Sequence, residues 1–146
     1  MADPAPDDGA EVDPALFDRV AADPLAQLLG IELEQVRPGY ARAGMTVGPR
    51  LLNAVGTAHG GATMALLDVV HAAVSNSHGT VAVAQDVHTE FLTAGRPGER
   101  LVAEGTELHR GRRTAVYRID ARGEDGRLVA TALARVFRTE QSWEPA

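Results

Sequence analysis

The most informative stretch of this 146-residue chain is an apolar segment that contains a few polar residues and glycines. In chain order these are Asn53, His59, Gly60, Gly61 and Asp68. Within residues 51–85, Asp68 is the one side chain with a formal charge. A carboxylate in apolar surroundings is costly unless it is hydrogen-bonded or paired. Its presence here therefore indicates either a structural partner or a chemical use.

The glycine pair precedes a run, residues 61–77, that contains no proline and consists mostly of good helix formers. The run is apolar on all sides, which is typical of a buried helix, and would extend roughly 25 Å. Glycines at a helix start let a ligand approach backbone N–H groups at the positive end of the helix dipole. An accessible N-terminus and one carboxylate two turns further along predict a functional site.

The segments on either side of this helix must hold it in place. Asp13-Pro14 and Asp23-Pro24 each put an N-cap residue before a proline, which predicts short helices over residues 14–22 and 24–29. Apolar alternation and turn residues predict strands over 31–36, 40–47, 81–92, 100–110, 114–122 and 128–138. In the strand after the helix, residues 81, 83, 85, 87, 89 and 91 are expected to share one mostly apolar face.

Two strands, one long helix and four further strands predict an α+β fold in which an antiparallel sheet wraps around the central helix. The chain length suits a single core. We expect an acidic, disordered segment over residues 1–13, one domain over 14–140 and a loose tail over 141–146.

Composition excludes several classes of protein. The absence of cysteine rules out a disulfide scaffold, a thiol nucleophile and a thiolate metal site. The net charge of −6 comes largely from residues 1–13, so nothing indicates a nucleic-acid partner. No apolar run is suited to span a bilayer, and we expect a cytoplasmic protein without a membrane partner. The sequence contains no metal-ligand spacing, Gly-x-Ser-x-Gly elbow or phosphate-binding loop.

The polar series has the form Asn53-x5-His59-Gly60-Gly61-x6-Asp68, and Asn76-Ser77 follows at the expected helix end. Together with the order of elements and the opening segment 23–31, this pattern resembles the hotdog-fold acyl-CoA thioesterases of the phenylacetate-degradation type. The resemblance covers residues 23–139. It implies that Asp68 attacks the thioester carbon or activates the water that does, and that the Gly60 N–H stabilises the oxyanion. It also implies that Asn53 and His59 are positioning residues, and that each site straddles a homodimer.

Alternatives to these roles remain open. Asp68 could be a structural carboxylate, Asn53 a loop residue, and His59 the general base, for which its ordinary pKa of roughly 6.5 is suited. His71 lies one helical turn beyond Asp68 and either pairs with it or is a hydrogen-bonded histidine at an interface. After Asp68, the related enzymes usually have a small or hydroxylated residue and then alanine. Here Val69 and Val70 replace them, and the bulk of Val70 is expected to narrow the acyl pocket.

The other candidate substrate-binding residues are Gly61, Asn76, Ser77, Arg110, Arg112 and Arg113. The three arginines are expected at a hairpin turn, where guanidinium groups suit the phosphates of coenzyme A; an ordinary solvated turn is the alternative.

The resemblance implies hydrolysis of an acyl-CoA, with an aromatic, phenylacetyl-type acyl group, to the free acid and coenzyme A. Coenzyme A is then part of the substrate, and no separate cofactor is expected. A dimer at least is expected, since a monomeric sheet can cover only part of the apolar helix, and a homotetramer made of two dimers is favoured. The alternatives are a hotdog enoyl-thioester or hydroxyacyl-thioester hydratase-dehydratase and a non-catalytic acyl-CoA-binding protein.

Overall fold

A computed structural model of the protein describes residues 9–143. The predicted order of elements is confirmed, with small changes at their ends. The helices are α1 (Pro14–Ala21), α2 (Pro24–Leu29), the 3-10 turn η1 (Pro49–Leu51) and α3 (Gly60–Ser75). The strands are β1 (Ile31–Arg37), β2 (Tyr40–Thr46), β3 (Thr80–Phe91), β4 (Arg100–Arg110), β5 (Thr114–Arg122) and β6 (Leu128–Ser142).

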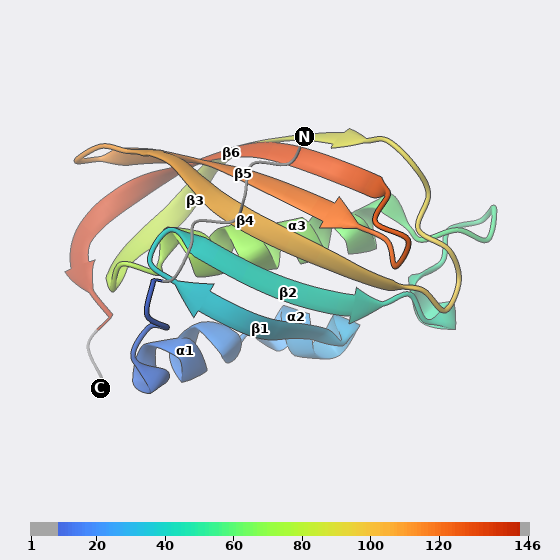
Figure 1. Cartoon of the computed structure of the whole chain (residues 1–146), viewed down its shortest axis with the longest axis horizontal. Coiled ribbons are helices and arrows are strands. Elements are labelled where there is room, and N and C mark those ends of the chain that lie inside the picture. The colour runs from blue at the N-terminus through green and yellow to red at the C-terminus, as the bar shows by residue number, and fades with distance from the viewer. Residues whose placement is uncertain (1–8, 144–146) are drawn as a thin grey trace.

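The strands form one six-stranded sheet in the order β1-β2-β4-β5-β6-β3, and every neighbouring pair is antiparallel. The helix α3 crosses one face of this sheet and packs mainly on β2, β4 and β5, while α1 and α2 lie beside β1 (Figure 1). This is the α+β hotdog architecture, so the predicted fold class is confirmed. None of the helices within residues 9–143 is long and apolar enough to cross a membrane.

Small side chains let α3 approach the sheet closely. The inner face of β5 presents Ala115, Tyr117, Ile119 and Ala121, all fully buried, as its alternation predicted. On β4, a Cβ added at Gly105 would lie 2.8 Å from Cγ1 of Val70. Interiors pack too densely to absorb such an overlap. Glycine is therefore required at position 105 because valine occupies position 70.

One stripe of α3 is not covered by the sheet. Most of the helix is buried, but Gly61, Asp68 and Ala72 are exposed, and Met64 and Ala65 are half-buried. These positions are three or four residues apart and therefore share one face of the helix. The sheet curves around only part of the helix, as expected for a single sheet against a helix that is apolar on all sides.

The strand β3 forms one edge of the sheet, and a bulge interrupts its alternation. Its pairing with β6 shifts register between Ala84 and Asp86. Before the shift, Val83 lies opposite the exposed Phe137, and after it Val87 lies opposite the buried Ala134. Paired residues share a face, so the prediction of a single apolar face through residues 81–91 is wrong. The bulge turns the second half of β3 so that its apolar side chains face α3.

Both ends of the described chain make hydrogen bonds to the rest of the domain. Near the N-terminus, the backbone N–H of Val12 donates to the carbonyl of Val36, 3.1 Å away. At the other end, β6 continues to Ser142, and the indole N–H of Trp143 donates to Oδ1 of Asn76 at 2.7 Å. Val12 and Trp143 are therefore hydrogen-bonded to the domain, and the disordered segment and the loose tail stay predictions. Residues 1–8 and 144–146 lie outside the described part of the chain.

Candidate active site

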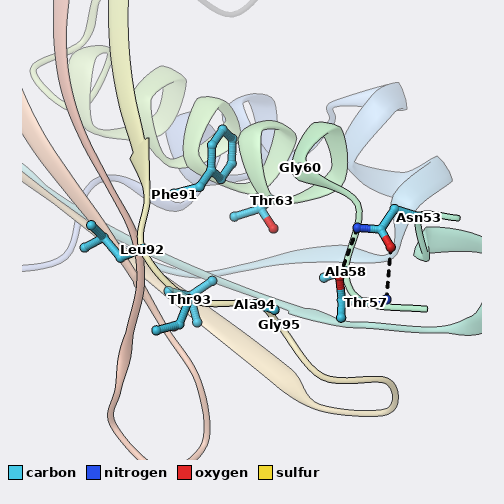
Figure 2. Close-up of a pocket in the computed structure, with 11 residues that line it drawn as sticks. Asn53, Thr57, Ala58, Gly60, Thr63, Phe91, Leu92, Thr93, Ala94 and Gly95 are labelled. Atoms are coloured by element: carbon cyan, nitrogen blue, oxygen red, sulfur yellow. Dashed lines mark hydrogen bonds between the residues drawn. The ribbon is translucent and has the colours of Figure 1, made fainter. Parts of the chain in front are cut away.

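A cavity of about 350 Å³ opens at the N-terminus of α3. It lies between the start of the helix, the loop before it and the end of β3 (Figure 2). It is lined by Asn53, Thr57, Ala58, Gly60, Thr63, Phe91, Leu92, Thr93, Ala94, Gly95 and Val129. Two of the predicted site residues, Asn53 and Gly60, therefore lie at the same cavity.

The side chain of Asn53 organises the loop that forms one wall. Its Oδ1 accepts from the backbone N–H groups of Val55 and Thr57, both at 3.1 Å, and its Nδ2 donates to Oγ1 of Thr57 at 2.9 Å (Figure 2). Asparagine is suited to such a turn because its side chain can replace a backbone partner. The contacts within this chain are those expected of a loop-forming residue.

His59 is the N-cap of α3. Its Nδ1 accepts from the N–H of Gly61 at 2.9 Å. Because Nδ1 is the acceptor, the proton of the neutral ring is on Nε2. A Cβ added at Gly61 would lie 3.1 Å from this Nδ1, so glycine at position 61 leaves room for the capping ring. The contact supports an orienting role for His59 and uses the N–H of Gly61.

Capping by His59 leaves the N–H of Gly60 available. Within residues 9–143, this N–H has no hydrogen-bond acceptor, as expected for the first residue of a helix. It lies at the positive end of the α3 dipole and borders the cavity. A backbone donor held in this position can stabilise negative charge on a substrate oxygen.

Asp68 is not part of this cavity. It lies eight residues after Gly60, about 12 Å further along the helix axis. Its side chain is 59% exposed, and its Oδ1 lies 3.8 Å from Nδ1 of the buried His71. Asp68 lies on the uncovered stripe of α3 and is therefore not enclosed by apolar residues of its own chain. A single chain therefore does not place Asp68 and the Gly60 N–H around the same substrate atom.

The remaining predicted substrate-binding residues lie at the opposite end of α3. The β4–β5 hairpin that carries Arg110, Arg112 and Arg113 is at the other end of the molecule from the loop before α3 (Figure 1). Arg112 is 83% exposed and has one long contact, 3.8 Å from Nη2 to Oε1 of Glu140. Its guanidinium group is therefore accessible to a ligand.

Asn76 and Ser77 instead stabilise the C-terminus of α3. The side chain of Asn76 accepts from the N–H of Ala82 and donates to the carbonyl of Ala72, both at 2.8 Å. Oγ of Ser77 accepts from the N–H of Gly39 at 2.9 Å and donates to the carbonyl of Val74 at 2.7 Å. Both residues are buried. These hydrogen bonds leave little for a ligand, and we leave both residues out of the proposed site.

Several lining residues were not identified from the sequence. Phe91 meets α3 because of the bulge in β3, and its ring would lie 3.6 Å from a Cβ at Gly60. Val129 joins the cavity through sheet pairing, since its carbonyl accepts from the N–H of Leu92 at 2.8 Å. Val70, expected to narrow the pocket, instead faces Gly105 and is not among the lining residues.

An ion pair between the buried Glu99 and the half-buried Arg127 supports the far wall of the cavity. Arg127 holds both carboxylate oxygens of Glu99 at 2.6 Å, and its Nη2 also donates to the carbonyl of Ala94 at 2.8 Å. This contact and the N–H groups of Arg96 and Glu124 lower the pKa of Glu99 to about 2. The same contact raises the pKa of Arg127. Within residues 9–143, no group of three or more His, Cys, Asp or Glu side chains is arranged to hold a metal ion.

Comparisons with known proteins identify the family of the chain. The profile of the thioesterase superfamily matches residues 55–130. A putative esterase of Archaeoglobus fulgidus is 36% identical over 84% of this chain and 80% of its own length. The acyl-coenzyme A thioesterase PaaI of Escherichia coli is 35% identical over 74% of this chain and 77% of its own.

Solved structures extend the similarity to three dimensions. The Escherichia coli PaaI protein, from the phenylacetic acid degradation operon, superposes with a TM-score of 0.82 and 31% identity. That superposition covers 88% of this chain and 91% of the other. A hypothetical thioesterase of Streptococcus pneumoniae, solved with coenzyme A, gives a TM-score of 0.74 and 32% identity over 77% and 88% of the two chains.

The chain belongs to the thioesterase superfamily and has the hotdog fold. Within that family it is of the PaaI type, and it is a thioester hydrolase.

Proposed function

We propose that this thioester hydrolase acts on acyl-CoA substrates with an aromatic, phenylacetyl-type acyl group. We further propose that each active site is built from two copies of the chain. Two relatives support an acyl-CoA thioester as the substrate. The Escherichia coli relative is named an acyl-coenzyme A thioesterase, and the Streptococcus pneumoniae structure was solved with coenzyme A. The aromatic acyl group is supported by the operon from which the Escherichia coli protein comes.

The observation that carries this proposal is the available N–H of Gly60, which borders a cavity lined by both polar and apolar side chains. A thioester carbonyl placed there would accept from this N–H, which lies at the positive end of α3. Attack on the carbonyl carbon puts negative charge on its oxygen, and a preorganised donor stabilises that charge most strongly where water is excluded. Phe91, Leu92 and Thr63 would surround the acyl group.

The attacking group would come from a second copy of the chain. Asp68 is about 12 Å along the helix from Gly60 of its own chain. A two-fold axis perpendicular to α3, beside its uncovered stripe, would place two such helices antiparallel. Asp68 of one copy would then face Asn53 and Gly60 of the other. The exposed stripe and the open β3 edge suit this pairing.

The chemistry needs water alone as co-reactant. Asp68 either attacks the thioester carbon directly or removes a proton from the attacking water. In the first route the carbon–sulfur bond breaks as an anhydride between Asp68 and the acyl group forms, and water then hydrolyses this anhydride to the free acid and the Asp68 carboxylate. In the second route water adds to the thioester carbon and the carbon–sulfur bond then breaks. In both routes coenzyme A leaves as the thiol after taking a proton that water supplies. Asn53 and His59 would hold the loop and the helix start in place, as their contacts in this chain suggest.

The test is a panel of acyl-CoA thioesters, with thiol release followed for the wild type and for Asp68→Asn. We expect the highest kcat/KM on an arylacetyl-CoA and a kcat at least 10²-fold lower in Asp68→Asn, because the nucleophile or base is lost. Asp18→Asn, which neutralises an exposed carboxylate on α1, is the matched control and should behave as wild type. Near wild-type hydrolysis by Asp68→Asn, or hydration of an enoyl-CoA without thiol release, would contradict the proposal.

A further inference from the structure

His71 is a polar residue in the middle of the core. It is 1% exposed and lies on α3 one turn after Asp68. One face of its ring meets Tyr117 of β5, with ring centroids 5.7 Å apart and planes tilted by 57°. Its Nδ1 lies 3.8 Å from Oδ1 of Asp68. Among residues 9–143, its Nε2 has no hydrogen-bond partner.

Packing alone does not account for a histidine here. A buried nitrogen without a partner costs free energy that an apolar ring of the same shape would not cost. Phenylalanine would retain the contact with Tyr117 and remove the unpaired nitrogen. The polar group near the ring, 3.8 Å from its Nδ1, is the Asp68 carboxylate. A polar side chain kept at a cost in stability is expected where it has a functional use.

We propose that His71 is a positioning residue for Asp68: in the assembled site its Nδ1–H donates a hydrogen bond to the carboxylate. This inference rests on the proposed function of Asp68. In the single chain Asp68 is exposed to solvent, and the 3.8 Å between its Oδ1 and Nδ1 of His71 is too long for a hydrogen bond. Once the partner subunit and the substrate cover it, water no longer supplies hydrogen bonds. A small rotation of the carboxylate towards the fixed ring then lets one carboxylate oxygen accept a hydrogen bond from Nδ1–H of His71 in place of water. The other carboxylate oxygen then points at the substrate.

The ring is well placed for this role. It is held between α3 and β5 by close packing, so its position is fixed before substrate binds. A reactive group is most effective when it is held near its productive geometry, and a displacement of about 1 Å can cost as much as 10²-fold in rate. The neutral ring with its proton on Nδ1 has its bare nitrogen, Nε2, in the apolar interior.

The test compares His71→Phe with His71→Asn. Phenylalanine keeps the ring volume without a donor, and we expect an equal or higher Tm together with a kcat roughly tenfold lower and a KM near that of wild type. Asparagine places an amide N–H near the position of Nδ1, and should recover a large part of the lost kcat. A purely structural histidine would give the reverse pattern, with Phe retaining kcat.

A second measurement does not depend on activity. Side-chain ¹⁵N NMR of the wild type should show His71 with its proton on Nδ1, and Asp68→Ala should change this signal. A proton on Nε2 in both proteins would overturn the inference, as would a wild-type kcat in His71→Phe. If wild type hydrolysed no thioester, the proposed function would fail. The NMR result would then decide separately whether His71 is bonded to Asp68.

Discussion

His59 has two possible functions that a single substitution separates. Its Nδ1 caps α3 by accepting from Gly61 at 2.9 Å. Asparagine is among the best N-cap residues, whereas alanine at a cap costs about 1 kcal/mol. If capping is its role, His59→Asn should keep Tm and most of kcat, and His59→Ala should lower Tm by about 2–4 °C. Thermal unfolding and initial rates measure both.

If His59 is instead the general base, His59→Asn should lose kcat rather than keep it. Asparagine does not take up a proton, so loss of the base would lower kcat by a factor on the order of 10² or more. Tm would be retained in His59→Asn under either function. A stable but inactive His59→Asn variant would therefore show that the imidazole acts as the general base.

Between elements, the ion pair of Glu99 and Arg127 connects the start of β4 to the segment before β6. Glu99 is 7% exposed, and its pKa is lowered from 4.5 to about 2. A carboxylate with a lowered folded-state pKa contributes stability that is complete above its unfolded pKa. That contribution is lost as the pH falls from 4.5 to about 2. Chemical denaturation across this range should show that the free energy of unfolding decreases as the pH is lowered.

Glu99→Gln should remove that part of the pH dependence. Glutamine loses the charge that Arg127 and two backbone N–H groups stabilise, so Tm at neutral pH should fall by several degrees. Glu104→Gln is the control, because its contact with Arg42 is substantially exposed and such pairs contribute at most about 1 kcal/mol. Equal losses in the two variants would argue against a special role for the Glu99 pair.

The β4–β5 hairpin offers a separate test of coenzyme A binding. Arg112 and Arg113 are exposed at its tip. If they bind the phosphates of coenzyme A, Arg112→Ala with Arg113→Ala should raise KM for an acyl-CoA several-fold, because arginine forks fit phosphate oxygens. KM for the matching pantetheine thioester, which lacks the nucleotide, should not change. The same charge can be removed by Arg118→Ala with Arg135→Ala, on exposed positions of β5 and β6. If the two double variants changed KM equally for both substrates, the hairpin would be an ordinary solvated turn that does not bind coenzyme A.

The sequence predicted the order of the helices and strands more accurately than it predicted which of their faces point to the core or the cavity. Proline, glycine and N-cap residues mark the ends of most segments, so the element order could be predicted. The bulge between Ala84 and Asp86 has no such mark, because Gln85 is neither glycine nor proline. It decides that Phe91 faces Gly60. Val129 reaches the same cavity through long-range strand pairing, which local periodicity does not encode.

The exposure of Asp68 likewise depends on the whole sheet. The sequence shows an apolar helix with one carboxylate, but the curvature of the sheet decides which stripe it covers. The uncovered stripe and the second half of the β3 edge, where Phe91 is more than half exposed beside Gly60, are adjacent surfaces of one molecule. Open strand edges and apolar patches of this kind favour association. At the scale of the whole molecule we therefore expect a dimer with joined sheet edges, and a dimer of dimers as the larger assembly.

Complementation tests whether the two copies share their active sites. Asp68→Asn subunits and Asn53→Ala subunits should each be inactive alone, the second because the loop from Asn53 to Thr57 loses its hydrogen bonds. After subunit exchange in an equal mixture, half of the dimers are hybrids. Each hybrid would have one doubly altered site and one site with the wild-type Asp68 and the wild-type Asn53. Activity should therefore return to about a quarter of the wild-type value, as two-fold symmetry requires. Mixing without recovery, or full activity in a species that sediments as a monomer, would show that each chain works alone.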